Sequence, residues 1–389
     1  MKLYVSDMHI GSGNQKDDFV YDAKFIELLD KYEDQITEFF IVGDFLELMH
    51  VKDKKILCET VQECMDLFDH EILNKIYNAH TALFDRLKKL SSKVRIRYIA
   101  GNHDYHVLFS EKIRQKVFSM TGCEEVLPFY YDEDWEIFVI HGNQFDAVNR
   151  LSYDGKNNII PTFGEYMAKF MSSNFDIKMS KILPDELISD YDNIRPLLDV
   201  FVWLDYINER YCLNYNLKEE WISEFINLIN AKQTRNWLKI NFPKYYRFTD
   251  FFVNKFGGMK LGESLVRTVM YFREFKKSDM YLKAAKRLLE NNFLIPRKNL
   301  VGYSDEDISL SNDKVKGLIM GHCHRPSYNQ VNCGKIKKFY ANTGAWKHVV
   351  MRNKGVNDNE FIKRSTVSYL VIDEYNKNLH AKLSVEEFY

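Results

Sequence analysis

Carboxylate, amide and imidazole side chains follow five short apolar runs of this chain, each at the point where the run ends. They are Asp7 with His9, Asp44, Asn102 with His103 and Asp104, His141, and His322 with His324. In α/β proteins ligands collect at the carboxyl ends of strands. Imidazole, carboxylate and amide ligands without thiolate suit Mn, Fe or Zn. These residues therefore predict a metal centre at the edge of a sheet.

The number of ligands predicts two metal ions. Even two of these aspartates, the asparagine and four of the five histidines are too many for one ion, and a carboxylate can bridge a pair. Two ions about 3.5–4 Å apart clamp the attacking and leaving oxygens of an in-line displacement at phosphorus. His322 and His324 are two residues apart, so on an extended chain they point to the same side, and Cys323 between them is expected to point away.

The five motifs differ in how specific they are. An isolated Asp-x-His or Gly-Asp is most often a turn. Gly101-Asn102-His103-Asp104 and Gly321-His322-Cys323-His324 are more specific, because an apolar strand, a glycine and several polar residues rarely coincide. All five together favour a functional site over five unrelated turns.

The elements that must position these side chains alternate between strands and helices over the first 150 residues. Strands are predicted at 3–5, 39–42, 94–100 and 137–140, and helices over 19–32 and over 58–90, the latter as one helix or two in series. Phe25, Leu28, Leu29 and Tyr32 recur at the spacing of one helix face. The continuous apolar run 39–42 is typical of a strand buried on both faces. Such alternation predicts a layered α/β domain.

From about 150 to 315 long helical patterns dominate, for example over 219–231 and 262–291. Strand patterns resume at 317–320 and 339–341, and 367–372 with 379–383 predict a closing antiparallel pair. We therefore predict a core formed by residues 1–150 and 316–389, with a large, mainly helical insertion (the cap) at 151–315.

Aromatic residues are interleaved with lysines in the predicted cap. They include Trp203, Tyr206, Trp221, Trp237, Tyr245, Tyr246, Phe248, Phe251 and Phe252. Two interpretations stay open: these side chains form the core of a helical subdomain, or they line a groove for an apolar part of a substrate.

The ordered set of motifs resembles the calcineurin-like metallophosphoesterase family. The motifs are Asp7-x-His9, Gly43-Asp44, Gly101-Asn102-His103-Asp104, His141-Gly142 and Gly321-His322-Cys323-His324. The resemblance covers residues 1–150 and about 316–389. It implies an α/β fold, a four-layer αββα sandwich with a dinuclear metal site at one edge, and says little about the insertion.

The resemblance also implies a ligand set for each metal ion. Asp7, His9 and His324 would hold the first ion, Asn102, His141 and His322 would hold the second, and Asp44 would bridge the two. The cofactors expected are two divalent metal ions, with Mn favoured and Fe or Zn as alternatives.

Asp44 and His103 are the expected catalytic residues. His103 lies beside the implied ligands and would protonate the leaving oxygen or stabilise charge in the transition state. Glu47, three residues after Asp44, stands where related phosphatases have an acid that orients this histidine. Asp104 would orient a neighbouring ligand. For Glu47 and Asp104 an ordinary structural role is the alternative.

The implied reaction is hydrolysis of a phosphate ester or pyrophosphate by in-line attack of a hydroxide that bridges the two metal ions. Three segments are similar to the UDP-2,3-diacylglucosamine hydrolase branch: Gly43-Asp44-Phe45-Leu46-Glu47, Gly321-His322-Cys323-His324-Arg325-Pro326 and Tyr340-Ala341-Asn342-Thr343-Gly344-Ala345-Trp346. A small phosphorylated substrate, lipid-linked in this interpretation, is therefore expected. Asn143 replaces the acid usual after His-Gly, His103 replaces an arginine, and the insertion is longer than that branch's cap.

A phosphodiesterase or nuclease is the alternative function. The double-strand-break repair nucleases share Gly-Asn-His-Asp and Gly-His-x-His, although their capping domain follows the last metal motif. Basic residues of the insertion would grip a phosphorylated substrate or form a solvated face; they are Arg247, Lys255, Lys260, Arg267 and Arg273. The formal net charge of -1 gives no strong signature of nucleic-acid binding. A remote alternative is a metal-binding scaffold without turnover, but all seven ligands and His103 are present.

Composition supports an ordinary globular protein. Of 389 residues, 46% are apolar and 28% charged. The six cysteines form no C-x-x-C pair and are expected to be reduced thiols. The start of the chain shows no apolar segment of signal-peptide type, and no transmembrane segment is expected. We therefore expect a cytoplasmic protein, whose oligomeric state the sequence does not indicate.

Overall fold

Two β-sheets face each other in the computed structural model, which describes residues 1–14, 16–50, 55–244, 246, 280–333, 336–353 and 360–388. The first sheet consists of β1 (Lys2–Val5), β2 (Glu38–Val42), β3 (Arg95–Ile99), β4 (Val126–Leu127), β14 (Lys347–Arg352), β15 (Phe361–Tyr375) and β16 (Asn378–Phe388). The second consists of β5 (Tyr130–Asp132), β6 (Ile137–Val139), β11 (Gly317–Met320), β12 (Ser327–Cys333) and β13 (Ile336–Asn342).

Parallel pairing at the centre of each sheet brings the predicted site residues to one end of the core. The first sheet has the order β14-β15-β1-β2-β3-β4, with β16 paired to β15, and the second has the order β12-β13-β11-β6-β5. The strands β1 to β4 are parallel to one another, and β11 is parallel to both β6 and β13. The predicted closing antiparallel pair is β15 with β16, both longer than predicted.

Successive residues of β2 face opposite sides of the sheet, as expected for a strand. Phe40 and Val42 lie in the hydrophobic cluster between the two sheets, and Phe40 stacks on Tyr4 at 4.5 Å. Phe39 and Ile41 lie in the largest cluster, which includes the buried side chains of the outer helices. Both faces of β2 are therefore buried, as its continuous apolar run predicts.

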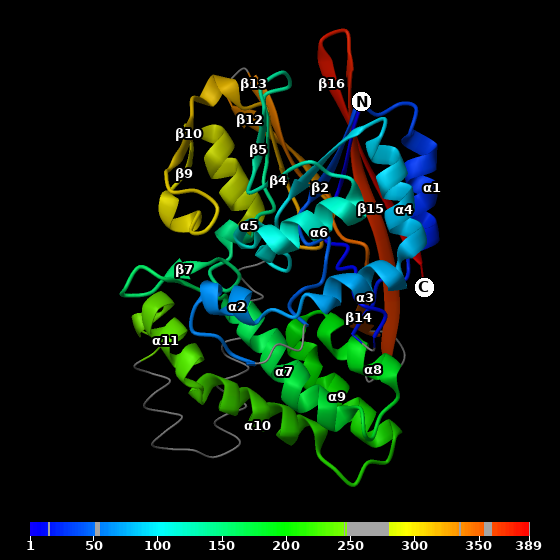
Figure 1. Ribbon diagram of the computed structural model, residues 1–389, viewed down its shortest axis with the longest axis vertical. Helices are drawn as coiled ribbons and strands as arrows, with labels where there is room; N and C mark the ends of the chain where they lie inside the picture. The colour runs from blue at the N-terminus through cyan, green and yellow to red at the C-terminus, as the bar shows by residue number, and fades with distance from the viewer. Residues whose placement is uncertain are drawn as a thin grey trace.

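Helices cover the outer faces of the two sheets and complete the four layers (Figure 1). Helices α1 (Asp22–Tyr32), α4 (Thr81–Ser91) and α6 (Glu111–Thr121) lie on the first sheet, and the helix over residues 280–290 lies on the second. The thiol of Cys333 donates a hydrogen bond to the carbonyl of Leu289 at 3.2 Å, which ties that helix to β12. The predicted fold class, an α/β sandwich of four layers, is confirmed.

Two predicted helices differ in extent from those observed. The stretch 58–90 forms three helices, α2 (Val61–Leu67), α3 (Glu71–Ala79) and α4, so the prediction of one helix or two was wrong. The backbone becomes extended at Phe68, and at His80 it leaves helical geometry where the imidazole meets two carboxylates. Helix α1 begins at Asp22 rather than 19, but its predicted apolar face is buried.

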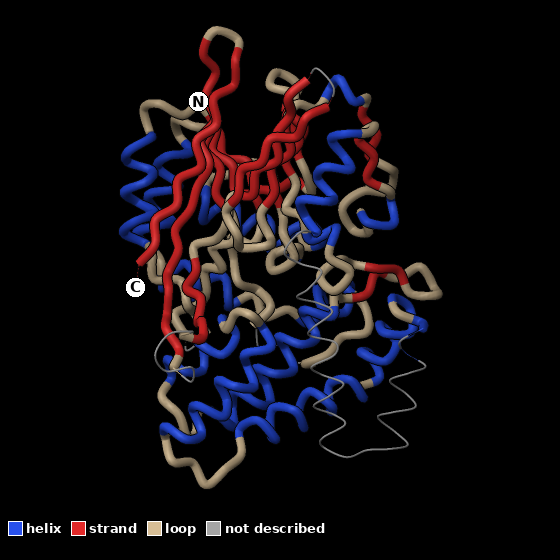
Figure 2. Tube along the Cα trace, turned by 180° about the vertical axis from the view of Figure 1, so that it is seen from behind, coloured by secondary structure: helices blue, strands red, loops and turns tan. Residues whose placement is uncertain are grey.

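A helical layer lies below the strand ends in Figure 1, and Figure 2 shows the same helices from behind. It contains α7 (Phe163–Met179), α8 (Asp185–Asp190), α9 (Val200–Arg210), α10 (Leu217–Asn230) and α11 (Lys232–Asn241), with the short pair β7 (Ser152–Tyr153) and β8 (Ile159–Ile160) and the 3₁₀ turns η2 (Tyr191–Asn193) and η3 (Leu197–Asp199). Trp203, Trp221 and Trp237 are buried in its own hydrophobic cluster. These three aromatic side chains therefore form the interior of the cap rather than a groove. Tyr245, Phe248, Phe251 and Phe252 lie outside the described residues.

The cap is joined to the core along β14. Ile194 forms an isolated parallel bridge with Val350, and the amide of Arg195 donates to the Val350 carbonyl at 2.9 Å. Val350 itself packs in the hydrophobic cluster of the cap.

The boundaries of the cap at 151 and 315 stay a prediction. Buried side chains between 281 and 303 pack in the largest cluster of the core. The remaining elements are α5 (His106–Phe109), β9 (Phe293–Ile295), β10 (Ile308–Leu310), and the 3₁₀ turns η1 (Asn143–Phe145), η4 (Arg297–Asn299) and η5 (Asn312–Lys314). Among the described residues, no helix is both long enough and apolar enough to cross a membrane.

The buried histidine at the α3–α4 junction predicts a pH-dependent contribution to stability. Burial alone would lower the pKa of His80, but Asp17 and Asp22, each 3.0 Å from one ring nitrogen, raise it to about 9. A raised folded-state pKa stabilises the fold fully below the ordinary value near 6.5, and this stabilisation disappears as pH rises through about 9. We expect His80→Gln to lower the free energy of unfolding more at pH 6 than at pH 10, measured by urea denaturation. The exposed His380→Gln should show no such difference, and equal losses at both pH values would contradict the ion pairs.

Candidate metal centre

Backbone hydrogen bonds hold the loops after the parallel strands against one another. The amide of Asp7 donates to the Gly43 carbonyl at 3.0 Å, and the amide of His9 donates to the Asp44 carbonyl at 2.9 Å. Between β6 and β11, the amide of Gly321 donates to the His141 carbonyl at 2.9 Å. The side chains that follow five different strands are thereby directed into one region.

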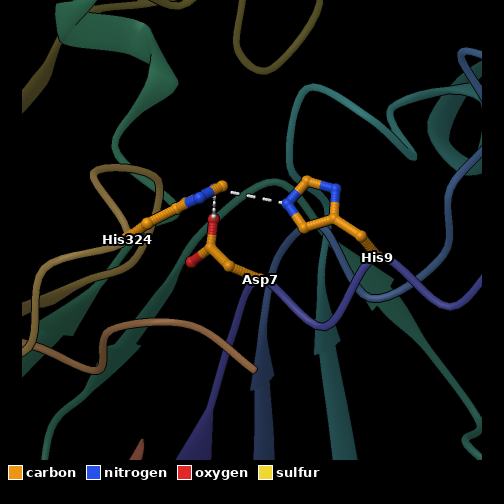
Figure 3. Close-up of side chains that lie close together, drawn as sticks. All are labelled: Asp7, His9 and His324. Carbon is orange, nitrogen blue, oxygen red and sulfur yellow. Dashed lines mark hydrogen bonds and ion pairs between the residues drawn. The ribbon is translucent and has the colours of Figure 1, made fainter. Parts of the chain in front are cut away.

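Three of these side chains form a first group of closely spaced ligand atoms. One atom each of Asp7, His9 and His324 lies within 4.8 Å of the others. His324 Nε2 is 3.2 Å from Asp7 Oδ1 and 3.3 Å from His9 Nε2 (Figure 3). Figure 3 shows the two rings and the carboxylate pointing toward one another. This is the donor set predicted for the first metal ion.

A second group contains Asp44, His141 and His322, with ligand atoms again within 4.8 Å of one another. His141 donates Nδ1–H to the Val42 carbonyl at 2.7 Å, which leaves Nε2 3.1 Å from Asp44 Oδ2. The Oδ1 atom of buried Asn102 has no hydrogen-bond partner among the described residues. A buried acceptor without a donor fits a metal ligand. The donors present thus suit a second divalent cation.

Asp44 belongs to a third group, with His9 and His103. His103 is predicted to lie beside the metal ions rather than to bind one, and the geometry places it within the same short range. Its Nδ1 is 2.7 Å from Glu47 Oε2, and His9 Nδ1 is 3.2 Å from the same oxygen. Glu47 therefore contacts His103 and also His9, a predicted metal ligand.

Asp104 holds the backbone of two loops together. Its carboxylate accepts hydrogen bonds from the amides of Gly101 at 2.7 Å and Phe45 at 2.8 Å, and from the hydroxyl of Tyr98 at 2.7 Å. The residues on either side of Asp44 and Asn102 are positioned in this way. Asp104 therefore contacts the backbone next to Asn102 and Asp44 rather than a ligand side chain.

The carboxylates of the centre stay ionised despite burial. Burial alone would raise the pKa of Asp44, but the charges of His141 and His103 hold it well below its usual range. The same opposition holds the pKa of Glu47 well below its usual range: burial alone would raise it, but the charge of His103 lowers it. Each anion is thus matched by imidazoles within the site.

The histidines divide into two kinds by their pKa. Burial alone would lower the pKa of His103, but Glu47 and Asp44 raise it to about 9. Likewise Asp44 and Asp7 overcome burial at His141 and raise its pKa to about 10. Burial lowers the pKa of His324 to about 3, against the attraction of Asp7. Because a metal binds only the neutral imidazole, loading of the centre would displace a proton from His141.

A model of the calcineurin-like phosphoesterase family matches residues 3–326. The chain belongs to this family. The match covers the five motifs and the predicted cap. Members of this family are metal-dependent phosphoester hydrolases, so the chain is an enzyme of this class. No curated protein gives a significant match to the chain. The predicted resemblance to the family is therefore confirmed, and the division of labour among the site residues stays a prediction.

Five predicted ligands of this phosphoesterase have left-handed backbone conformations that non-glycine residues adopt rarely. Their φ angles are 51° at Asp7, 50° at His9, 51° at Asp44, 65° at His322 and 57° at His324. Residues held in such regions cost of order 1–3 kcal/mol each and gather at functional sites. The hydrogen bonds between the loops hold these ligands against that cost.

The segment 342–346 packs against the strand end that carries Asp7. The amide of Trp346 donates to the Asp7 carbonyl at 3.2 Å. The hydroxyl of Ser6 donates to the Gly344 carbonyl at 3.0 Å and lies 2.5 Å from the Thr343 hydroxyl. These contacts support the strand end that carries Asp7 and His9. The sulfur of Cys323 lies 3.7 Å from the Arg325 carbonyl, outside the three ligand groups.

Two histidine side chains of the centre are partly exposed to solvent. The side chains of His103 and His324 are 22% and 24% exposed. Those of Asp7, His9, Asp44 and His141 are almost fully buried. A substrate therefore approaches from the side of His103 and His324. The basic residues predicted to grip a substrate, Arg247, Lys255, Lys260, Arg267 and Arg273, lie outside the described residues.

One acidic residue at the site was missed by sequence reasoning. Asp146 is buried, and its Oδ2 is 3.3 Å from Nε2 of His322. Asn143, where an acid is usual in the related branch, instead donates to the hydroxyl of Tyr303 at 3.0 Å. The sequence does place an acid, Asp146, three residues after Asn143. Its spacing from His141-Gly142 matches no motif that we recognised, so it was not predicted as a site residue.

The motif glycine Gly43 shows how tightly the centre is packed. A Cβ on Gly43 would lie 2.3 Å from Nδ1 of His141, and φ at Gly43 is +84°. We expect Gly43→Ala to lower the free energy of unfolding by about 1–3 kcal/mol and to reduce the stabilisation that added Mn²⁺ confers, because His141 must move. Gly155 has no atom within 4 Å of the corresponding position, so Gly155→Ala is the matched control. Thermal unfolding with and without Mn²⁺ tests this, and equal behaviour of the two variants would contradict the tight packing.

Proposed function

We propose that this enzyme hydrolyses a phosphate ester or pyrophosphate at a centre of two divalent metal ions. Asp7, His9 and His324 would hold one ion, Asn102, His141 and His322 the other, and Asp44 both. The observation that carries the proposal is the position of Asp44. Its carboxylate is 3.1 Å from His141 on one side and 4.0 Å from His9 on the other. It therefore lies close to a proposed ligand of each ion, and it shares one group with His141 and His322 and another with His9 and His103.

Two bound ions supply Lewis acidity, which makes water nucleophilic at neutral pH and neutralises charge on the phosphoryl oxygens. Mn²⁺ is our first choice, and Fe or Zn suit the same ligands. The protein holds these donors in one buried region before any substrate arrives. The backbone bonds from the Asp7 and His9 amides to the neighbouring loop fix the geometry. In-line attack at phosphorus needs such a fixed arrangement.

His103 is the proposed general acid for the leaving oxygen. Its Nδ1 faces Glu47 at 2.7 Å, so Nε2 is the ring nitrogen that remains for the substrate. Glu47 and Asp44 raise the pKa of the ring to about 9 in the metal-free protein, which favours its protonated form. Its partial exposure, on the side from which a substrate approaches, supports direct contact with the leaving group. Glu47 would hold the ring in place and keep it protonated.

The substrate we propose is small and phosphorylated, with a lipid-linked UDP-sugar as its finer form. Support for the finer form comes from the local motifs around Asp44, His322 and Trp346 and from the cap between the fourth and fifth motifs. The burial of Trp203, Trp221 and Trp237 removes these side chains from any acyl-chain groove. A groove would therefore have to be formed by other residues of the cap.

The His103→Ala variant tests the proposed reaction. We expect turnover of an alkyl phosphodiester, whose alkoxide leaving group must be protonated, to fall about 10²–10⁴-fold, the usual contribution of general acid catalysis, while both metal ions stay bound. In the wild-type enzyme kcat/KM should decline as pH rises through the His103 pKa, because the acid form is lost. His380→Ala, an exposed histidine on the β15–β16 hairpin, is the control. Full turnover by the His103→Ala protein would remove the proposed acid.

The choice of substrate is tested with the Mn²⁺-loaded enzyme and UDP-2,3-diacylglucosamine. We expect cleavage to UMP and a lipid phosphate, resolved by chromatography, with bis(p-nitrophenyl) phosphate as the positive control. Cleavage of the control alone would exclude the lipid-linked substrate and keep the phosphoesterase. Hydrolysis of single- or double-stranded DNA in the same assay would favour the nuclease alternative instead.

A further inference from the structure

We propose that Asp146 is a positioning residue for His322, and through it for the second metal ion. This inference rests on the proposed dinuclear centre. The Oδ2 atom of Asp146 is 3.3 Å from Nε2 of His322, and the side chains come from loops 176 residues apart. A carboxylate that accepts a hydrogen bond from Nε2–H leaves Nδ1 as the nitrogen with a lone pair for a metal ion.

Asp146 is itself held firmly. Its Oδ1 accepts a hydrogen bond from the amide of Val148, and its Oδ2 accepts one from the side-chain amide of Asn149, both at 3.0 Å. The backbone carbonyl of Asp146 accepts hydrogen bonds from the amides of Asn149 and Arg150. The residue is only 5% exposed. The carboxylate is thus oriented by its own turn.

The backbone of His322 is fixed separately from its ring. Its amide donates to the carboxylate of Asp7, with distances of 2.9 and 3.1 Å to the two oxygens. The ring lies edge-on to that of His141, with 5.2 Å between ring centres. The hydrogen bond from the His322 amide to Asp7 therefore positions the main chain, whereas the contact with Asp146 defines the rotation of the imidazole.

The same arrangement recurs at two other histidines of the centre. His141 donates Nδ1–H to the Val42 carbonyl at 2.7 Å, and Nδ1 of His9 faces Glu47 at 3.2 Å. In each case an oxygen acceptor engages one ring nitrogen and directs the other toward the ligand group. Oxygen acceptors of this kind set the tautomer of metal-binding histidines. Asp146 completes the pattern for His322.

The Asp146→Asn variant tests this role by titration of the metal-free protein with Mn²⁺, followed calorimetrically. For the wild-type protein we expect two binding events. In the variant one event should weaken about 10–100-fold, the usual effect of losing such a partner, and the other should stay unchanged. His322→Ala should abolish the event that Asp146→Asn weakens, whereas His324→Ala should affect the other one.

Asp132→Asn is the matched control, because Asp132 is also buried but bonds to Lys2 at the opposite end of β1. Two unchanged events in Asp146→Asn, or two events weakened alike, would overturn the inference while leaving the proposed function intact. Fewer than two events in the wild-type protein would overturn both.

Two further measurements separate positioning from other roles. With Co²⁺ bound at both sites, the visible absorption of Asp146→Asn should report the same coordination number as the wild type at each ion, since a positioning residue is not a ligand; a lower coordination number would overturn the inference. If the Asp146→Asn protein does not fold but the Asp132→Asn protein does, the Asn149→Ala variant tests the positioning role instead, because it removes only one hydrogen-bond donor to Asp146. That variant should weaken the same binding event several-fold, and an unchanged event would count against the role.

Discussion

The burial of two carboxylates beside each other is the constraint on which the rest of this structure depends. Asp7 and Asp44 are 0% and 1% exposed, and burying a charge is costly unless it is paired and hydrogen-bonded. The amides of His322 and His103 donate to them, and the imidazoles of His141 and His324 face them. Divalent cations bound to these donors would add further compensation for the buried negative charge.

The cap contributes to this arrangement through the loop that carries His103. Tyr105, two residues further on, donates its hydroxyl to Glu165 of α7 at 2.6 Å, and Lys169 pairs with the same buried carboxylate at 2.8 Å. Together with the bridge between Ile194 and Val350, these contacts seat the cap against the strand ends. The loop that carries His103 and helix α7 of the cap are therefore parts of one packed unit.

Much of the fold and of the centre could be predicted from the sequence, because the signals are local. An apolar run that ends in Gly43-Asp44 identifies a strand and the ligand at its end, and parallel strands bring such ends together. The helix ends within 58–90 could not be predicted in the same way. The backbone becomes extended at Phe68, and at His80 the helix ends where the imidazole contacts Asp17 and Asp22, which lie 63 and 58 residues earlier in the sequence.

The sequence by itself determined the fold class, the family and which residue types stand at the strand ends. Only the tertiary structure decided that Asp146 meets His322, that Glu47 contacts His9 as well as His103, and that three tryptophans fill the cap. The reason is physical. Periodicity and motif spacing report what a residue does within its own element, whereas a contact between loops depends on how distant strands are registered and packed, which no local pattern encodes.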